Sequence, residues 1–308
     1  MTTVYYNAAS DGQLEILDKP KNGAWISVMG PDDTELDRLA KDFELDRDLL
    51  GDAVDIYEAP RIEKDGSSVY VYTRYCYPEG KEIATEPLLL IITPDNVITV
   101  MRADTSILNR FTSGAREVRT TAKTHLVMEI MEEINHSYQL QLNRVSKQIL
   151  RTRAQLRQSQ ISNRDFIGII ELEEDLNEFL AALHPQASLL MAFTTTKYIR
   201  LAEDDKEMIE DLILEARELI ELTKSRLRTL VNIRQAYDAI ATNNLNKTFK
   251  RLTSIAIFLT IPTVVGGLWG MNVAVPFHDD PHAFSYVLLI SIFLVTGVVL
   301  FFKRKRWL

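Results

Sequence analysis

Residues 252–275 read LTSIAIFLTIPTVVGGLWGMNVAV and contain no charged side chain. A second uncharged run covers residues 283–302, whereas residues 1–246 are rich in charge. An α-helix rises about 1.5 Å per residue, so a run of about 20 apolar residues matches the thickness of a bilayer. The sequence therefore predicts two transmembrane helices at the C-terminal end of a chain of 308 residues.

Charge and cysteine content restrict the class of protein. The formal net charge is −8, which argues against a nucleic-acid partner, because such binding needs a clustered basic surface. The single cysteine, Cys76, cannot form an intrachain disulfide, so we expect a reducing compartment. The N-terminus, which begins Met1-Thr2-Thr3-Val4, has neither the basic n-region nor the apolar h-region of a signal peptide, and we expect none.

Basic residues flank the two apolar runs on one side only. They are Lys247, Lys250 and Arg251 before the first run, and Lys303, Arg304, Lys305 and Arg306 after the second. The connecting loop contains Asp279 and Asp280 but no Lys or Arg. By the positive-inside rule, both termini are cytoplasmic and the loop is outside. Trp269, Tyr286 and Trp307 stand near the expected interfaces, where aromatic side chains are enriched.

The first hundred residues have the pattern of a mixed α/β domain. Segments 25–29, 69–75 and 88–92 are rich in β-branched, aromatic or apolar residues and predict strands. The turn signal at 93–96 predicts that 97–100 pairs back as a hairpin. Between the first two strands, 32–43 and 46–54 predict helices, each opening with an aspartate suited to capping.

Helical periodicity dominates from residue 106 to 200 and again from Asp204 onward. Ser162-Asn163-Arg164-Asp165 predicts a break between two long helices. Between Asp204 and Ile261 there is no proline or glycine, and apolar residues recur at three- and four-residue steps. One helix of roughly 65 residues, about 100 Å long, is predicted to continue into the first transmembrane segment. Neighbouring copies and the preceding helices are its expected partners.

Two transmembrane helices per chain cannot enclose a water-filled path, so a pore requires several copies. Residues 287–302 of the second run are almost wholly Val, Leu, Ile and Phe and suit contact with lipid. The first contains hydroxyl and small residues, which allow close helix approach and offer polar groups. They are Thr253, Ser254, Thr260, Thr263, Gly266, Gly267 and Gly270. Each alone is also compatible with simple packing, but together they make the first run the better candidate for a pore wall.

The candidate pore wall has no Asp, Glu, Lys or Arg. A pore for a dehydrated ion would show charged rings or a carbonyl filter. Neutral amide, hydroxyl and glycine backbone groups instead suit an ion that keeps its water shell. Mg²⁺ dehydrates reluctantly and fits this description, as other hydrated divalent ions also do.

Gly270-Met271-Asn272, at the end of the first of two C-terminal spans, resembles the signature of CorA-type magnesium channels. Trp269 before it, Pro262 eight positions earlier and the basic ending FKRKRWL strengthen the resemblance. It implies an α+β cytoplasmic domain built as an α/β/α sandwich, a long helical stalk and two transmembrane helices. The whole would form a funnel-shaped homopentamer, and the tripeptide would form the outer selectivity filter, with Asn272 hydrogen-bonding the water shell of Mg²⁺.

The resemblance also implies which residues line the pore. They are Gly267, Thr263, Thr260, Leu252, Phe249 and Asn246. Leu252 and Phe249 would form a hydrophobic constriction, and Asn246 would form a polar ring at the inner mouth. At Thr260 and Phe249 the chain departs from the methionines of the family.

Family members close when cytoplasmic Mg²⁺ binds between neighbouring subunits. By resemblance, Asp211 on the long helix and Asp52 in the helix before Pro60-Arg61 would be the regulatory metal ligands. The physical logic is that facing carboxylates repel until a divalent ion bridges them. Gly51 stands where the family has an acidic residue.

These inferences define a set of expected segments. The N-terminal α/β cytoplasmic domain covers 1–105, its helical part 106–203 and the stalk 204–251. The pore-lining helix is 252–271, the outer loop 272–283, the second transmembrane helix 284–302 and the basic tail 303–308.

Other candidate sites have simpler explanations. The acidic run Glu171, Glu173, Glu174, Asp175 and Glu178 predicts a solvated helix face, or else a surface that accumulates cations. Glu203-Asp204-Asp205 predicts a helix N-terminus. His278-Asp279-Asp280-Pro281-His282 could bind a transition metal or attract cations to the pore mouth.

No catalytic constellation is visible, and we expect no enzyme. The sequence predicts a multi-pass protein of the cell membrane that takes up divalent cations, most simply Mg²⁺, under the control of cytoplasmic Mg²⁺. A transporter of the same fold for Zn²⁺, Co²⁺ or Ni²⁺ is one alternative. A membrane-anchored oligomeric sensor or scaffold that transports nothing is the other.

Overall fold

The structure, a computed structural model, describes residues 1–8, 14–80, 82–103, 106–157, 163–195, 198–199, 201–277 and 279–305. It divides into two compact units, Met1–Arg234 and Gln235–Leu308. Helix α6 (Glu203–Trp269) contributes to both units, and no proline or glycine interrupts it before Pro262. The predicted long helix is therefore confirmed.

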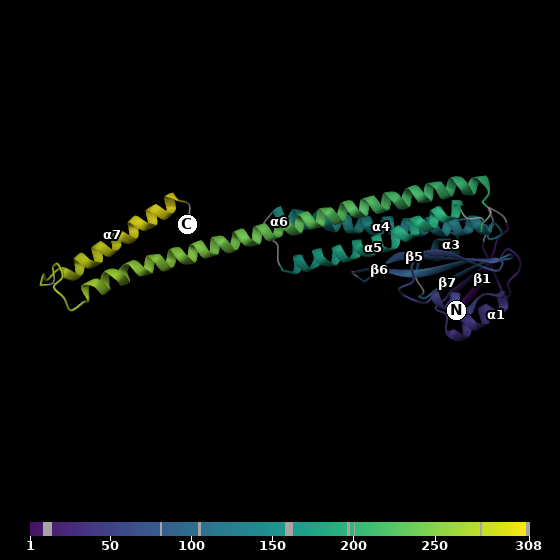
Figure 1. Cartoon of the computed structure of the whole chain (residues 1–308), viewed down its shortest axis with the longest axis horizontal. Helices are drawn as coiled ribbons and strands as arrows, with labels where there is room; N and C mark the ends of the chain where they lie inside the picture. Colours follow the sequence, from purple (N-terminus) through teal and green to yellow (C-terminus); the bar gives the residue numbers. More distant parts are fainter. Residues whose placement is uncertain are drawn as a thin grey trace. The chain divides into compact units, whose positions relative to one another are not determined.

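A seven-stranded sheet is the centre of the first unit (Figure 1). Its order is β2-β1-β3-β7-β6-β5-β4, and β3 pairs with β7 in parallel while the other neighbours pair antiparallel. The strands are β1 (Thr2–Tyr6), β2 (Glu15–Leu17), β3 (Trp25–Met29), β4 (Arg61–Asp65), β5 (Ser68–Glu79), β6 (Glu82–Ile92) and β7 (Val97–Met101). The strands predicted from sequence correspond to β3, β5, β6 and β7, whereas β1, β2 and β4 were not predicted.

The hairpin between β6 and β7 forms where the turn signal predicted it. The amide of Thr93 donates to the carbonyl of Asn96 at 2.9 Å, and the amide of Asn96 donates back to Thr93 Oγ1 at 2.8 Å. Both residues are buried, so these bonds satisfy backbone groups that water cannot reach.

Two short helices cover one face of the sheet. They are α1 (Asp33–Phe43) and α2 (Arg47–Asp52). Asp32 and Asp46 cap them as predicted, each accepting hydrogen bonds from backbone amides of the first helical turn. Leu36, Leu39 and Leu50 pack from these helices against the apolar side chains of the sheet.

Three long helices cover the opposite face: α4 (Lys123–Arg157), α5 (Asn163–Thr195) and the first part of α6. The unit is thus an α/β/α sandwich, as predicted (Figure 1). Cys76 of β5 packs against this helical layer and is 2% exposed, and burial raises the pKa of its thiol to about 12. The break predicted at Ser162 falls on a residue outside the described part of the chain.

Helices dominate the described residues between 106 and 195, as the periodicity predicts, but residues 113–122 are not helical. After η1 (Ser106–Leu108) and α3 (Asn109–Thr112), Gly114 adopts a positive φ of 75°, and the chain becomes irregular. This segment is held by Asn7, which donates through Nδ2 to the carbonyl of Val118 and exchanges bonds with Thr120. Contacts of high sequence separation thus override local helical propensity here.

The acidic start of α6 is a helix N-terminus, as predicted. Asp205 accepts a hydrogen bond from the amide of Ala202 at 3.2 Å, the reciprocal half of a capping box. The same carboxylate lies 3.0 Å from Nδ1 of His125 at the beginning of α4. Asp205 therefore fixes where α6 begins.

In the second unit, α6 ends at Trp269 and the chain returns in α7 (Ala283–Arg304) (Figure 1). Both helices are long and apolar enough to cross a membrane, and few residues of their apolar windows are buried. The two predicted apolar helices are therefore present. Arg306 and Trp307 lie outside the described residues.

Candidate functional site

Helix α7 covers one side of the apolar part of α6. Within this unit, Ser254 and Val265 are buried and Phe258 contacts Phe302 of α7, with ring centroids 5.8 Å apart. Ser254 Oγ donates to the carbonyl of Lys250 at 2.8 Å, so its hydroxyl is satisfied within the helix. These residues recur at helical spacing and define the side of α6 that faces α7.

The residues predicted to line a pore lie away from this side of α6, with Asn246 the nearest to it at about 80° around the helix from Ser254. Successive residues of a helix are about 100° apart, so residues two positions apart point in roughly opposite directions. Thr260 is two positions from Phe258, Gly267 two from Val265, and Leu252 two from Ser254. All six predicted pore-lining residues are exposed in the single chain: Asn246, Phe249, Leu252, Thr260, Thr263 and Gly267. We call this side of α6 the open face.

The hydroxyls on the open face are orientated by their own helix. Thr260 Oγ1 donates to the carbonyl of Ala256 at 2.8 Å, and Thr263 Oγ1 donates to the carbonyl of Leu259 at 2.9 Å. A hydroxyl whose proton is used in this way keeps its lone pairs free to accept. The water molecules around a cation present hydrogens outward, so the open face offers the acceptors that a hydrated cation needs.

The Gly270-Met271-Asn272 motif begins where the hydrogen bonding of α6 stops. The amide of Gly270 donates to the carbonyl of Gly266 at 2.9 Å. A Cβ atom at Gly270 would lie 3.2 Å from that same carbonyl oxygen, so a larger residue would disturb the end of the helix. Met271 and Asn272 are exposed, and the side-chain amide of Asn272 makes no hydrogen bond to the described part of the chain.

The loop after the motif folds back onto the helix end. Trp269 Nε1 donates to the carbonyl of Pro276 at 3.2 Å, and Phe277 packs on Tyr286 of α7, with centroids 5.6 Å apart. Asp280 Oδ1 accepts from the amide of His282 at 2.8 Å. The carboxylate of Asp280 is therefore used within the loop, and His278 lies outside the described residues, so the proposed metal site of this loop stays a prediction.

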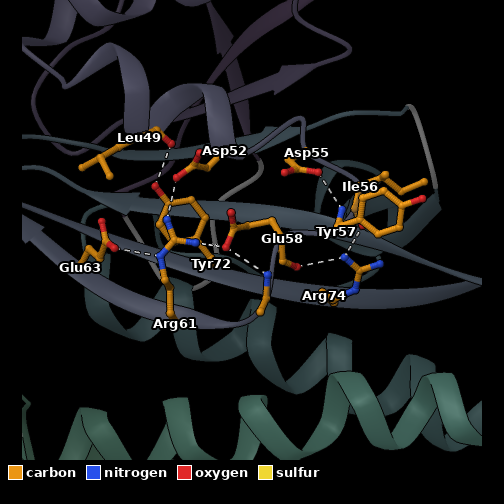
Figure 2. Close-up of polar contacts among 11 residues, drawn as sticks. Leu49, Asp52, Asp55, Ile56, Tyr57, Glu58, Arg61, Glu63, Tyr72 and Arg74 are labelled. Carbon is orange, nitrogen blue, oxygen red and sulfur yellow. Dashed lines mark hydrogen bonds and ion pairs between the residues drawn. The ribbon is translucent and has the colours of Figure 1, made fainter.

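In the first unit, the predicted regulatory ligand Asp52 is already ion-paired. Figure 2 shows Arg61 between three carboxylates: Asp52 at 2.7 Å, Glu63 at 2.9 Å, and Glu58. The guanidinium also lies over the ring of Tyr72, 3.9 Å from its centroid. This cluster was not predicted from the sequence, although acidic residues on both sides of Arg61 were a usable signal.

The carboxylates of this cluster stabilise the charged form of Arg61. Burial alone would lower the pKa of Arg61, but its bonds to Glu63 and Asp52 outweigh that effect, and the pKa is raised. Burial raises the pKa of the Tyr72 hydroxyl, which donates to the carbonyl of Leu49 at 2.8 Å. Three carboxylates face one guanidinium, so the cluster keeps a net negative charge.

The second predicted regulatory ligand, Asp211, is exposed on α6. Its carboxylate makes no hydrogen bond or ion pair with a residue that the structure describes. A Cβ atom at Gly51 would contact only Arg47 Nη1, at a van der Waals distance of 3.5 Å. A larger side chain would therefore fit at this position. Among the described residues, no group of three or more His, Cys, Asp or Glu side chains could hold a metal ion within one chain.

The acidic run of α5 is only partly the solvated face that its sequence predicted. Glu171 and Glu174 are exposed. Glu173 instead pairs with Arg234 of α6 at 2.7 Å, and Glu178 accepts from the hydroxyl of Thr85 at 2.6 Å and from its amide at 3.1 Å. These two carboxylates connect α5 to α6 and to the sheet.

Comparisons with known proteins agree with this architecture. The family described as "CorA-like Mg2+ transporter protein" matches residues 21–304. The cobalt/magnesium transport protein CorA of Methanocaldococcus jannaschii is 23% identical over 298 residues, 92% of this chain and 91% of the relative. The protein of the same description from Thermotoga maritima is 21% identical over 307 residues, 92% of this chain and 83% of the relative.

A solved structure matches the whole chain. It is described as the complete structure of the CorA magnesium transporter from Methanocaldococcus jannaschii. The TM-score is 0.88 at 20% identity, and the match covers 100% of this chain and 99% of the other. The fold thus extends through both units, including the two apolar helices.

Proposed function

The chain belongs to the CorA-like Mg²⁺ transporter family, and on that premise we propose that it forms a homopentameric channel for the uptake of Mg²⁺. Members of this family are membrane transporters of divalent metal ions. The proposal adds the direction of transport, the preferred ion and the control by cytoplasmic Mg²⁺.

The open face of α6 is the observation on which the proposal depends. It is uncharged, exposed in the single chain and opposite the side that α7 covers. In lipid, hydroxyl groups and glycines on this face would gain nothing, whereas they suit a water-filled path between copies. A pore would form when the open faces of several copies meet around one axis.

The chemistry of the open face supports a hydrated ion. Thr260 and Thr263 present acceptor lone pairs, and Asn272 presents an amide at the outer end. Mg²⁺ gives up its coordinated waters reluctantly, so recognition through the water shell favours this ion. Leu252 and Phe249, 63% and 55% exposed, would form the hydrophobic constriction, which can close by dewetting, and Asn246 the inner polar ring.

The regulatory part of the proposal involves Asp52 and Asp211 of neighbouring copies. A cytoplasmic Mg²⁺ ion bridging them would stabilise the closed arrangement. Because Asp52 is paired with Arg61, the ion must compete with a guanidinium for this carboxylate. The net negative charge of the Arg61 cluster favours the cation, and the absence of an acidic side chain at Gly51 removes one ligand.

The orientation and segments follow from the flanking charges. We assign both termini to the cytoplasm, the soluble part to 1–203, the stalk to 204–251 and the outer loop to 272–283. A membrane potential of 100 mV, negative inside, would then contribute about 2.3 kcal/mol per charge, or twice that for Mg²⁺. No other energy source is needed for uptake.

Ion competition in proteoliposomes tests the choice of ion. We expect Mg²⁺ influx to saturate and to be inhibited by Co²⁺ more weakly than by unlabelled Mg²⁺, with Zn²⁺ the weakest competitor. Zn²⁺ flux that exceeds Mg²⁺ flux would favour the transporter of the same fold for transition metals. Oligomers without any divalent flux would identify a scaffold instead.

A further inference from the structure

A chain of buried polar side chains crosses the first unit between the sheet and α6. It consists of Thr73 on β5, Gln186 on α5 and Asn135 on α4, which we call the polar relay. Thr73 Oγ1 donates to Gln186 Oε1 at 3.2 Å, and Gln186 Nε2 donates to Asn135 Oδ1 at 3.0 Å. Asn135 Nδ2 then donates to the carbonyl of Leu212 on α6 at 3.2 Å, with Glu215 Oε2 at 3.4 Å.

The relay is fully enclosed. Thr73, Gln186 and Asn135 are 1%, 0% and 2% exposed, and they lie among apolar residues of the helical layer. Buried polar groups are costly unless every one is paired, and none of these three is among the unpaired buried polar atoms of the described chain. Apolar side chains of similar size would fill the same space, so the relay must supply something that packing does not.

The relay defines the position and the rotation of α6. Apolar contacts between α6 and its neighbours tolerate small rotations or slides of the helix, whereas a hydrogen bond to one carbonyl does not. A shift by one residue would move the Leu212 carbonyl by about 1.5 Å and turn it by about 100°. The relay therefore fixes α6 both along and around its axis with respect to the sheet.

Both ends of the relay lie beside the proposed regulatory ligands. Leu212, whose carbonyl is held, follows Asp211 directly. At the other end, Thr73 follows Tyr72, and successive residues of a strand point to opposite faces of a sheet. Tyr72 thus lies on the other face, where its ring supports Arg61, and Arg61 binds Asp52 (Figure 2).

We propose that Gln186 and Asn135 are positioning residues that couple the Asp52 and Asp211 sides of each subunit. The inference rests on the proposed regulation by cytoplasmic Mg²⁺. A bridging ion binds only when carboxylates of adjacent copies have the correct separation, and each copy sets its own two carboxylates through the relay. Loss of the relay leaves each carboxylate present but no longer held in one geometry.

The test replaces the relay without leaving unpaired polar groups. The full chain carrying Thr73→Val, Gln186→Leu and Asn135→Leu is reconstituted in proteoliposomes, and Mg²⁺ influx is measured with Mg²⁺ on the cytoplasmic side clamped at a series of concentrations. Replacing all partners by apolar groups of similar shape limits the loss of stability. We expect flux in the absence of cytoplasmic Mg²⁺ to persist and the half-closing concentration to rise by about 5-fold or more.

Thr99→Val is the matched control. It removes the hydrogen bond from Trp25 Nε1 to Thr99 Oγ1, at 3.1 Å, which is equally buried but does not reach α6. This variant should close at the same Mg²⁺ concentration as the parent. Thr73→Val alone keeps the shape of the side chain and should raise the half-closing concentration by a smaller factor than the triple variant. This single variant replaces the triple variant in the test if the latter does not assemble.

The failures of the two proposals are distinguishable. A parent channel that ignores cytoplasmic Mg²⁺ would overturn the proposed regulation, and the role of the relay with it. A parent that closes with Mg²⁺, together with relay variants that close at the parental concentration, would overturn the coupling alone. A shift of equal size in Thr99→Val would also overturn it, because the effect would then reflect general loss of packing.

Discussion

Asn272→Ala is expected to reduce Mg²⁺ influx into proteoliposomes by about 100-fold or more, because every copy loses its filter amide at once. The side-chain amide of Asn272 makes no bond to the described chain, so its removal leaves the fold intact. What the variant loses is the group that would hold the water shell of the ion at the outer end of the pore. The measurement is initial influx with the amount of assembled protein matched between samples.

Asn244→Ala provides the control for this prediction. Asn244 is also an exposed asparagine of α6, but it lies two positions from Asn246 and thus points away from the open face. The control should transport at the parental rate and form the same oligomer. Parental flux in Asn272→Ala would refute the filter role assigned to this amide.

Asp211→Ala is expected to raise the cytoplasmic Mg²⁺ concentration that closes the channel by about 10-fold or more, within the range of measured allosteric couplings. Asp211 is exposed and unpaired among the described residues, so its carboxylate is available to an ion. Its removal takes away a ligand that the bridging ion needs to stabilise the closed arrangement. The variant should therefore stay open at concentrations that close the parent.

Glu210→Ala tests whether any lost negative charge on α6 would have the same effect. Glu210 is exposed and adjacent, but it points about 100° away from Asp211 around the helix. It should retain parental closure. Asp52→Asn should shift closure by less than Asp211→Ala, since Asp52 is already shared with Arg61. Unchanged closure in Asp211→Ala would contradict the assignment.

Periodicity and composition predicted the helices and the central strands because these depend on local pattern. The aspartate caps of α1 and α2, the hairpin at Thr93 and the long α6 all follow from short stretches of sequence. The edge strands β2 and β4 and the neighbouring β1 were missed, since they are short and partly exposed. The irregular segment after Gly114 depends on Asn7, more than a hundred residues away, which a local pattern cannot reveal.

The candidate site was predictable to a different extent in the two units. The residues of the open face of α6 were predicted through the resemblance to CorA-type channels, and the structure adds that α7 lies on the opposite side. The pairing of Asp52 with Arg61 and the polar relay join residues from six different elements, which are α2, β4, β5, α5, α4 and α6. Such contacts arise only from tertiary packing. The acidic residues on both sides of Arg61 could have indicated a charged cluster, but no spacing in the sequence pairs this arginine with Asp52.

Cysteine accessibility tests most directly whether the open face of α6 lines the pore. The native Cys76 is 2% exposed and its pKa is raised to about 12, so it supplies little thiolate and adds little background. A cationic, membrane-impermeant thiol reagent is added to proteoliposomes containing Thr263→Cys. Leu289→Cys on α7, which is 63% exposed in the single chain and assigned to lipid, is the control. We expect the reagent to block Mg²⁺ influx through Thr263→Cys and to spare influx through Leu289→Cys. Block of the Leu289→Cys channel without block of the Thr263→Cys channel would contradict the assignment of the open face to the pore wall.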